Sequence, residues 1–143
     1  DLASGKLRWR RAEPEILRLL AANRNQLLLE TADGFAAIEP DSGRREWFTP
    51  IDDRWDGNVA AALPDAIVYL GAVAEEGARR RSLPVLRWID PSSGRLMRTA
   101  PLDMPIEGPI IAPLVAGDGR LWVLTAGSPD DRGAALVQII PKR

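Results

Sequence analysis

The chain of 143 residues contains no cysteine and no histidine. Without cysteine it has no disulfide framework, no thiolate nucleophile and no cysteine-based zinc or iron–sulfur site. Without histidine it has no Ser-His-Asp triad, no HExxH zinc site and no histidine-ligated haem. Catalysis would therefore depend on carboxylates, lysine, tyrosine or a bound cofactor. The absence of cysteine leaves the redox compartment open.

The chain also lacks a large excess of charge of one sign and a long apolar run. Nineteen basic and 20 acidic residues leave a formal charge of -1, which disfavours strong binding to nucleic acid or to an anionic membrane. The apolar stretch PIIAPLV at 109–115 is much shorter than the roughly 20 residues of a membrane-spanning helix. The sequence has no initiator methionine and no signal peptide, which suggests a processed product or a fragment. Its length and average composition predict one folded domain, 1–143.

A short turn motif occurs three times along the chain. The copies read DLASGKLRW at 1–9, EPDSGRREW at 39–47 and DPSSGRLMR at 90–98. Each has an acidic residue four positions before the glycine of a Ser-Gly pair, and the glycines are 38 and 51 residues apart. The shared positions are Asp1, Ser4 and Gly5; Glu39, Ser42 and Gly43; and Asp90, Ser93 and Gly94. The recurrence predicts a repeated structural unit.

The segments between the motifs consist of short apolar runs separated by turn residues, which is typical of β-hairpins. The helical alternative for Glu15–Ala22 is rejected because the other repeats contain no matching helix. The expected strands are 15–21, 26–32, 34–40 and 44–49; then 58–64, 66–73, 82–90 and 95–100; then 109–116, 119–126 and 133–140. The third repeat lacks a fourth strand, and we expect Lys6–Trp9 at the other end of the chain to supply it. The predicted fold is all-β, with antiparallel four-stranded sheets formed by repeats at about 10–49, 50–100 and 101–143 plus 1–9.

The motif resembles the repeat of the quinoprotein-like β-propellers, also called PQQ-like repeats. The stretch AAIEPDSGRREW at 36–47 is the best copy, LASGKLRW at 2–9 is good, and LRWIDPSSGRLMR at 86–98 has Arg98 in place of the tryptophan. The resemblance implies that Trp9 and Trp47 dock one blade on the next, that the glycine turns the hairpin, and that the acid holds that turn. The motif residues are therefore expected to be structural.

Members of this family include pyrroloquinoline quinone (PQQ) dehydrogenases, periplasmic lipoproteins that assemble outer-membrane proteins, and sensor domains. This chain has neither the vicinal cysteines nor a recognisable calcium-binding set of the dehydrogenases, so we expect no cofactor, no metal and no catalytic residues. The resemblance implies a non-catalytic module for protein interaction or scaffolding in an extracytoplasmic bacterial compartment. A dehydrogenase fragment and a ligand-sensing domain are the alternatives. Three blades are fewer than a closed propeller has. We therefore expect either that two copies close a six-bladed ring or that the chain is one part of a longer propeller whose remainder lies in another segment, so that a second copy or a protein partner completes the ring.

One acidic cluster is a candidate binding surface. Asp52, Asp53 and Asp56 surround Trp55 in the stretch IDDRWDGN. The cluster lacks the ligand spacing of an EF-hand calcium loop. We interpret it as a loop between repeats with a partly exposed tryptophan, and a contact patch for sugar or peptide is the alternative.

Overall fold

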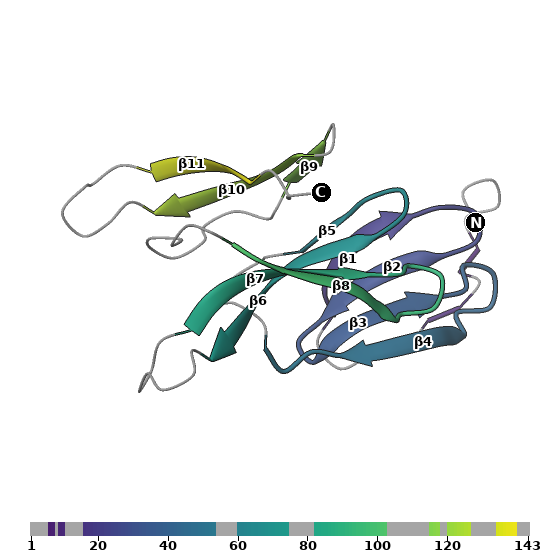
Figure 1. The fold of residues 1–143 in the computed structure, drawn as a ribbon. Helices are drawn as coiled ribbons and strands as arrows, with labels where there is room; N and C mark the ends of the chain where they lie inside the picture. Colours follow the sequence, from purple (N-terminus) through teal and green to yellow (C-terminus); the bar gives the residue numbers. More distant parts are fainter. Residues whose placement is uncertain are drawn as a thin grey trace. The chain divides into compact units, whose positions relative to one another are not determined.

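In the computed structural model the described chain consists of β-strands in three antiparallel sheets (Figure 1). The structure describes residues 6–7, 9–10, 16–53, 60–74, 82–102, 115–117, 120–126 and 134–139. Within these ranges there are two four-stranded sheets, one three-stranded sheet and no helix. The all-β fold class is confirmed. The choice of strand over helix near Glu15–Ala22 is also confirmed, since a strand occupies Ile16–Ala22.

The chain forms two compact units, and each is described by itself. The first unit comprises Asp1–Asp52 together with Pro91–Arg95, and the second comprises Asp53–Asp90 together with Leu96–Arg143. Pro91–Arg95 is the turn that connects two strands of the second unit. This turn therefore belongs to the first unit although both of its strands belong to the second.

The first sheet is an antiparallel meander with the strands in sequence order. Its strands are β1 (Ile16–Ala22), β2 (Leu27–Thr31), β3 (Gly34–Ile38) and β4 (Arg45–Pro50). The β1–β2 turn is held by the Asn23 side chain, whose Oδ1 accepts hydrogen bonds from the backbone N–H groups of Asn25 at 2.8 Å and Gln26 at 2.9 Å. Such Asn turns reverse the chain locally, and they explain why the sequence places this hairpin correctly.

The second sheet repeats the arrangement of the first. Its strands are β5 (Ala60–Ala62), β6 (Ile67–Ala74), β7 (Ser82–Ile89) and β8 (Leu96–Pro101), again in sequence order. The last strand pair of each sheet has a register shift at the same place, after Ala37 in β3 and after Trp88 in β7. Just before the shift Ala37 lies opposite Trp47, and Trp88 lies opposite Arg98. The two pairs are therefore equivalent positions in the two sheets.

The third sheet belongs to the second unit. Its strands are β9 (Val115–Gly117), β10 (Arg120–Ala126) and β11 (Ala134–Ile139), in the order β11-β10-β9. These strands lie within or beside the segments predicted for the third repeat. Residues 109–114 of its first predicted strand lie outside the described residues.

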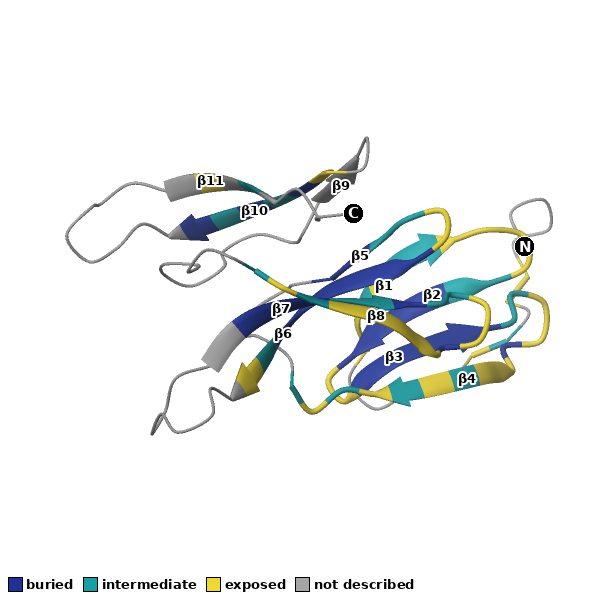
Figure 2. Ribbon diagram, in the orientation of Figure 1, coloured by how far each residue is buried: buried dark blue, intermediate teal, exposed yellow. Residues whose placement is uncertain are grey.

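Both units bury apolar side chains along their central strands (Figure 2). In the first unit β3 is buried along its whole length, whereas β4 alternates between exposed and half-buried residues. In the second unit Val68 and Leu70 of β6 pack with Leu121 and Val123 of β10. Because β3 and most of β6 are buried on both faces, they read as continuous apolar runs with little alternation.

The described residues of the expected strand at Lys6–Trp9 do not form a strand. Lys6, Leu7 and Trp9 have no strand structure, and Lys6 and Leu7 are exposed. The prediction that this segment forms a strand is therefore wrong for the residues described, and the described third sheet has three strands.

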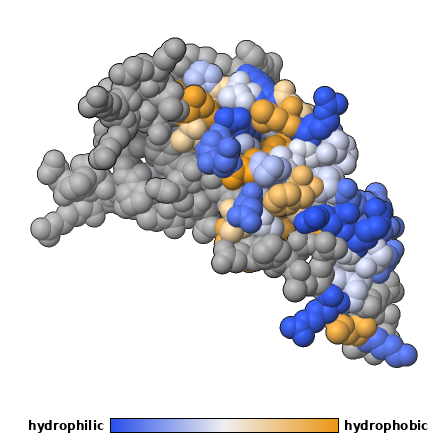
Figure 3. All heavy atoms as spheres, turned by 90° about the horizontal axis from the view of Figure 1, so that it is seen from below, coloured by the Kyte–Doolittle hydropathy of each residue, from blue (hydrophilic) through white to orange (hydrophobic). Residues whose placement is uncertain are grey.

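The outer strands carry exposed apolar side chains. They include Ile16, Leu17 and Leu19 on β1, Phe48 on β4, and Leu96 and Met97 on β8. On the face drawn in Figure 3 apolar groups form small patches among charged and polar ones. Among the described residues no helix is long and apolar enough to cross a membrane.

Candidate functional site

The turn of the second motif is a compact, internally bonded loop between β3 and β4. The backbone N–H of Gly43 donates to the Glu39 carbonyl at 2.9 Å, and the N–H of Glu39 donates to the Arg44 carbonyl at 2.9 Å. Gly43 has a φ of +70°, in the left-handed region where a Cβ is unfavourable. The glycine of the motif is therefore needed by the turn itself.

The acidic residue of this motif is bonded to the serine of the same motif. The Ser42 hydroxyl donates to Oε2 of Glu39 at 2.6 Å, and Nε of Arg44 lies 3.4 Å from the same oxygen. The Ser42 hydrogen bond is the main cause that lowers the pKa of Glu39 from 4.5; desolvation opposes it, and the charge and hydrogen bond of Arg44 lower the pKa further. Glu39 thus serves the turn as an ionised acceptor.

The tryptophan of the first motif contacts the turn of the second. Nε1–H of Trp9 donates to the Pro40 carbonyl at 2.7 Å. The indole lies so close to Gly43 that a Cβ there would be 2.7 Å from Cδ2 of Trp9. Trp9 also packs against Leu29, Ala36 and Ile38 of the first sheet. The Gly43 position therefore needs glycine for two reasons, its φ and the ring above it.

The tryptophan of the second motif contacts the turn of the third in the same way. Nε1–H of Trp47 donates to the Pro91 carbonyl at 3.0 Å, and the Thr49 hydroxyl donates to the Gly94 carbonyl at 2.5 Å. Gly94 has a φ of +73°, and a Cβ there would lie 2.6 Å from Cε3 of Trp47. One arrangement is thus made twice: a tryptophan donates to a proline carbonyl and covers the glycine of the next motif.

The third motif differs at the tryptophan position. Arg98 stands there, and its guanidinium carbon lies 5.0 Å from the ring centroid of Trp88 on the neighbouring strand. In the first sheet the corresponding pair is Ala37 with Trp47. The tryptophan of this pair is therefore on the third strand of the second sheet, whereas in the first sheet it is on the fourth strand. Asp90 is half-buried, Ser93 Oγ accepts from the Arg95 N–H at 3.4 Å, and Ser4 and Gly5 lie outside the described residues.

The predicted acidic surface is only partly described, because Trp55 and Asp56 lie outside the described residues. Asp52 is exposed. Asp53 is ion-paired with Nη2 of Arg87, its Oδ1 lies 3.4 Å from the Tyr69 hydroxyl, and its carbonyl accepts from the Ala72 N–H at 2.6 Å. The backbone of Asp53 is therefore bonded to β6, and its side chain is ion-paired with Arg87 on β7.

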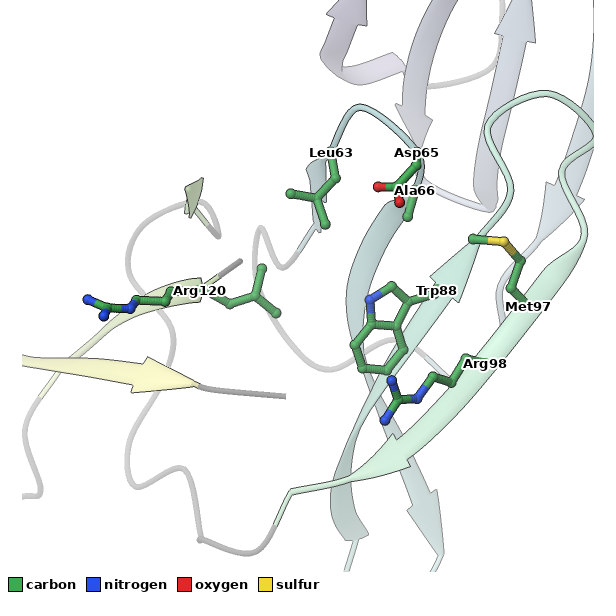
Figure 4. Close-up of a pocket in the computed structure, with 8 residues that line it drawn as sticks. Leu63, Asp65, Ala66, Trp88, Met97, Arg98 and Arg120 are labelled. Carbon is green, nitrogen blue, oxygen red and sulfur yellow. The ribbon is translucent and has the colours of Figure 1, made fainter. Parts of the chain in front are cut away.

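A pocket of about 370 Å³ lies beside Trp88 in the second unit (Figure 4). Leu63, Ala66, Leu121 and Met97 supply apolar groups, and Asp65, Arg98 and Arg120 supply charged ones. In Figure 4 Arg98 extends along the Trp88 ring, whereas the Arg120 guanidinium is directed away from it. This pocket is not predicted from the sequence. The sequence feature that could have indicated the pocket is Trp88, which stands where the preceding repeat has the smaller Ala37.

A buried ion pair lies in the first sheet and was also missed. Glu30 on β2 is fully buried, and its Oε2 accepts from Nε of Arg18 at 3.1 Å and from Nη2 at 2.6 Å. Arg18 lies directly opposite Glu30 in the β1–β2 register. The Arg18 guanidinium thus neutralises the charge of the buried Glu30 carboxylate. The apolar runs around both residues gave no indication that the two would be adjacent.

The described residues contain no group of three or more acidic side chains that could hold a metal ion. The polar contacts described above are indole N–H donors on proline carbonyls and an arginine stacked on a tryptophan. In the comparisons with known proteins, no family model matches the chain and no curated protein is similar to it.

Proposed function

We propose that this chain is part of a quinoprotein-like β-propeller and serves as a non-catalytic module for protein interaction or scaffolding. The observation that carries the proposal is the repeated contact of Trp9 with the Pro40–Gly43 turn and of Trp47 with the Pro91–Gly94 turn. A repeat protein is stabilised by such contacts between each unit and the next. In a propeller they would link consecutive blades, and the two four-stranded meanders would be two of these blades.

A binding role rather than catalysis is supported by the use of the motif residues. Glu39, Ser42, Trp9 and Trp47 are all bonded within turns or to the next turn. Asp53 is bonded to Arg87. These side chains are therefore occupied in holding the fold. By analogy with the family, the proposed location is extracytoplasmic.

The proposed partner is a second copy of the chain, which would complete the ring. The edge strand β1 supports this proposal, because Ile16, Leu17 and Leu19 are between 46% and 54% exposed. An edge strand with exposed apolar side chains favours association. A partner that covers β1 would remove these side chains from water.

Sedimentation equilibrium tests the second copy directly. We expect a mass of twice 15.7 kDa, reduced to a single chain by Leu17→Lys combined with Leu19→Lys. The control is Leu96→Lys, an equally exposed leucine on the outer strand β8, which should leave the dimer intact. A soluble monomer of the unaltered chain at all concentrations would contradict the second copy as the partner.

Absorbance titration with PQQ and calcium tests the non-catalytic role. We expect no saturable binding and no dye-linked oxidation of alcohols. Saturable binding with turnover would replace the proposal by its alternative, a fragment of a quinoprotein dehydrogenase.

A further inference from the structure

The pocket beside Trp88 occupies the position at which the first sheet receives a turn. In the first sheet the Ala37–Trp47 pair lies where the Pro91–Gly94 turn is bound. The equivalent pair in the second sheet is Trp88–Arg98, after which the same register shift occurs. The residues that line the pocket include this pair and the β5–β6 turn residues Leu63, Asp65 and Ala66.

We propose that this pocket binds a proline-containing turn of a partner polypeptide, of the type acid-Pro-x-Ser-Gly. The inference rests on the proposed interaction role and names the chemistry of the partner. In the first unit such a turn is recognised by an indole face on its glycine and by an N–H donor to its proline carbonyl. The second unit has the same two groups on exchanged strands: Trp88 provides the aromatic face and Arg98 provides the donor.

The exchange of tryptophan for arginine changes which turn is preferred. The indole of Trp47 can donate one hydrogen bond, whereas a guanidinium has several donors and a positive charge. An acidic residue precedes the proline in two of the turns in this chain, as Glu39 and Asp90. Arg98 would therefore contact both the carbonyl and the acid of an incoming turn. This complementarity favours an acidic turn over a neutral one.

The remaining lining contains apolar groups from Leu63, Ala66, Met97 and Leu121 and charged groups from Asp65 and Arg120. The apolar groups suit a proline ring and the glycine backbone. The volume of about 370 Å³ lies within the roughly 300–1,000 Å³ of pockets that bind organic ligands. Ala100 stands in the equivalent position to Thr49, so the second hydrogen bond of the first-unit contact is replaced by the contacts of the guanidinium.

The probe for this site is a blocked peptide with the chain's own turn sequence, Asp-Pro-Ser-Ser-Gly-Arg. It is titrated into the full 143-residue chain while the Nε1–H signal of Trp88, assigned with Trp88→Phe, is followed by NMR. We expect a saturable shift of this signal and a dissociation constant about tenfold higher in Arg98→Ala, because a charge-assisted hydrogen bond is lost. A peptide of scrambled order should not bind.

The matched control is Arg45→Ala. Arg45 is an exposed arginine that lies 5.4 Å from the ring centroid of Phe48, so its removal deletes an arginine–aromatic contact elsewhere. It should leave peptide affinity unchanged. Equal weakening of peptide affinity by Arg45→Ala and Arg98→Ala would overturn the proposal. The proposal would also be overturned if the peptide produced no saturable shift of the Trp88 signal, or if benzoate shifted this signal and the peptide did not.

Arg98→Gln provides a second variant that keeps an N–H donor and removes the charge. It should bind the acidic peptide more weakly than the unaltered chain does. It should also bind the peptide Asn-Pro-Ser-Ser-Gly-Arg with the same affinity as the acidic peptide. The outcomes are separable from those of the proposed function. Oxidation of alcohols with PQQ would refute the non-catalytic role and leave the peptide result standing, whereas failure of the peptide alone would refute only this site.

Discussion

Replacement of Gly94 by alanine should destabilise the chain mainly through its effect on Trp47. Alanine at a φ of +73° costs about 1–2 kcal/mol. The added Cβ would also lie 2.6 Å from Cε3 of Trp47 and 2.7 Å from Oγ1 of Thr49. Because no real Cβ contact is so short, the indole must move, and such overpacking costs roughly 1–3 kcal/mol. We therefore expect Gly94→Ala to lower the free energy of unfolding by about 2–5 kcal/mol.

A double-mutant cycle separates the two effects. Trp47→Ala alone should cost roughly 2–3 kcal/mol, less than a fully buried tryptophan, because the ring is half-buried and donates one hydrogen bond. Once the indole is absent, Gly94→Ala should cost the roughly 1–2 kcal/mol of its φ angle together with the displacement of the Thr49 hydroxyl, which the Cβ still contacts. The coupling energy is then about 1–3 kcal/mol in magnitude.

Urea unfolding followed by far-UV circular dichroism measures all four chains without using tryptophan fluorescence. Gly94→Asn is the informative control, because asparagine tolerates the left-handed region but still carries a Cβ. It should remain clearly destabilised next to Trp47 and approach the unaltered turn in the Trp47→Ala background. A coupling energy below about 0.5 kcal/mol, within ordinary additivity, would refute the assigned contact between indole and glycine.

Two further predictions concern the charged groups of the first unit. The pKa of Glu39 is lowered from 4.5 in the folded chain. Its stabilising contribution is therefore fully present above pH 4.5 and is lost as the pH falls through the folded pKa. Ser42→Ala should raise that pKa toward 4.5 in an NMR titration, and an unchanged pKa would contradict the role of the hydroxyl. Arg18→Met leaves the fully buried Glu30 carboxylate without this cation and should cost about 3–5 kcal/mol in urea unfolding. Glu30→Gln should cost less, because the Arg18 side chain is 21% exposed and can be rehydrated; equal costs would show that burial of Glu30 does not dominate.

Much of the local structure could be predicted because it depends on neighbours in sequence. Asn23 and the Ser-Gly pairs reverse the chain through hydrogen bonds and φ angles that involve only a few residues. The strand bounds between these turns agree with the structure to within about two residues in the first sheet. Lys6–Trp9 was predicted as a strand because the repeat pattern has one at this position, but Lys6, Leu7 and Trp9 have no strand structure.

The amino-acid sequence by itself determined where the chain turns and which segments extend, because turn chemistry and β-propensity are local properties. Only the tertiary structure decided what each side chain meets. It assigned Pro40 and Pro91 as the acceptors of the two indoles, paired Asp53 with Arg87, buried Glu30 beside Arg18 and placed Arg98 over Trp88. These contacts join residues between 10 and 44 positions apart. Strand register brings such residues together, and register is fixed by the packing of whole sheets, which no short stretch of sequence encodes.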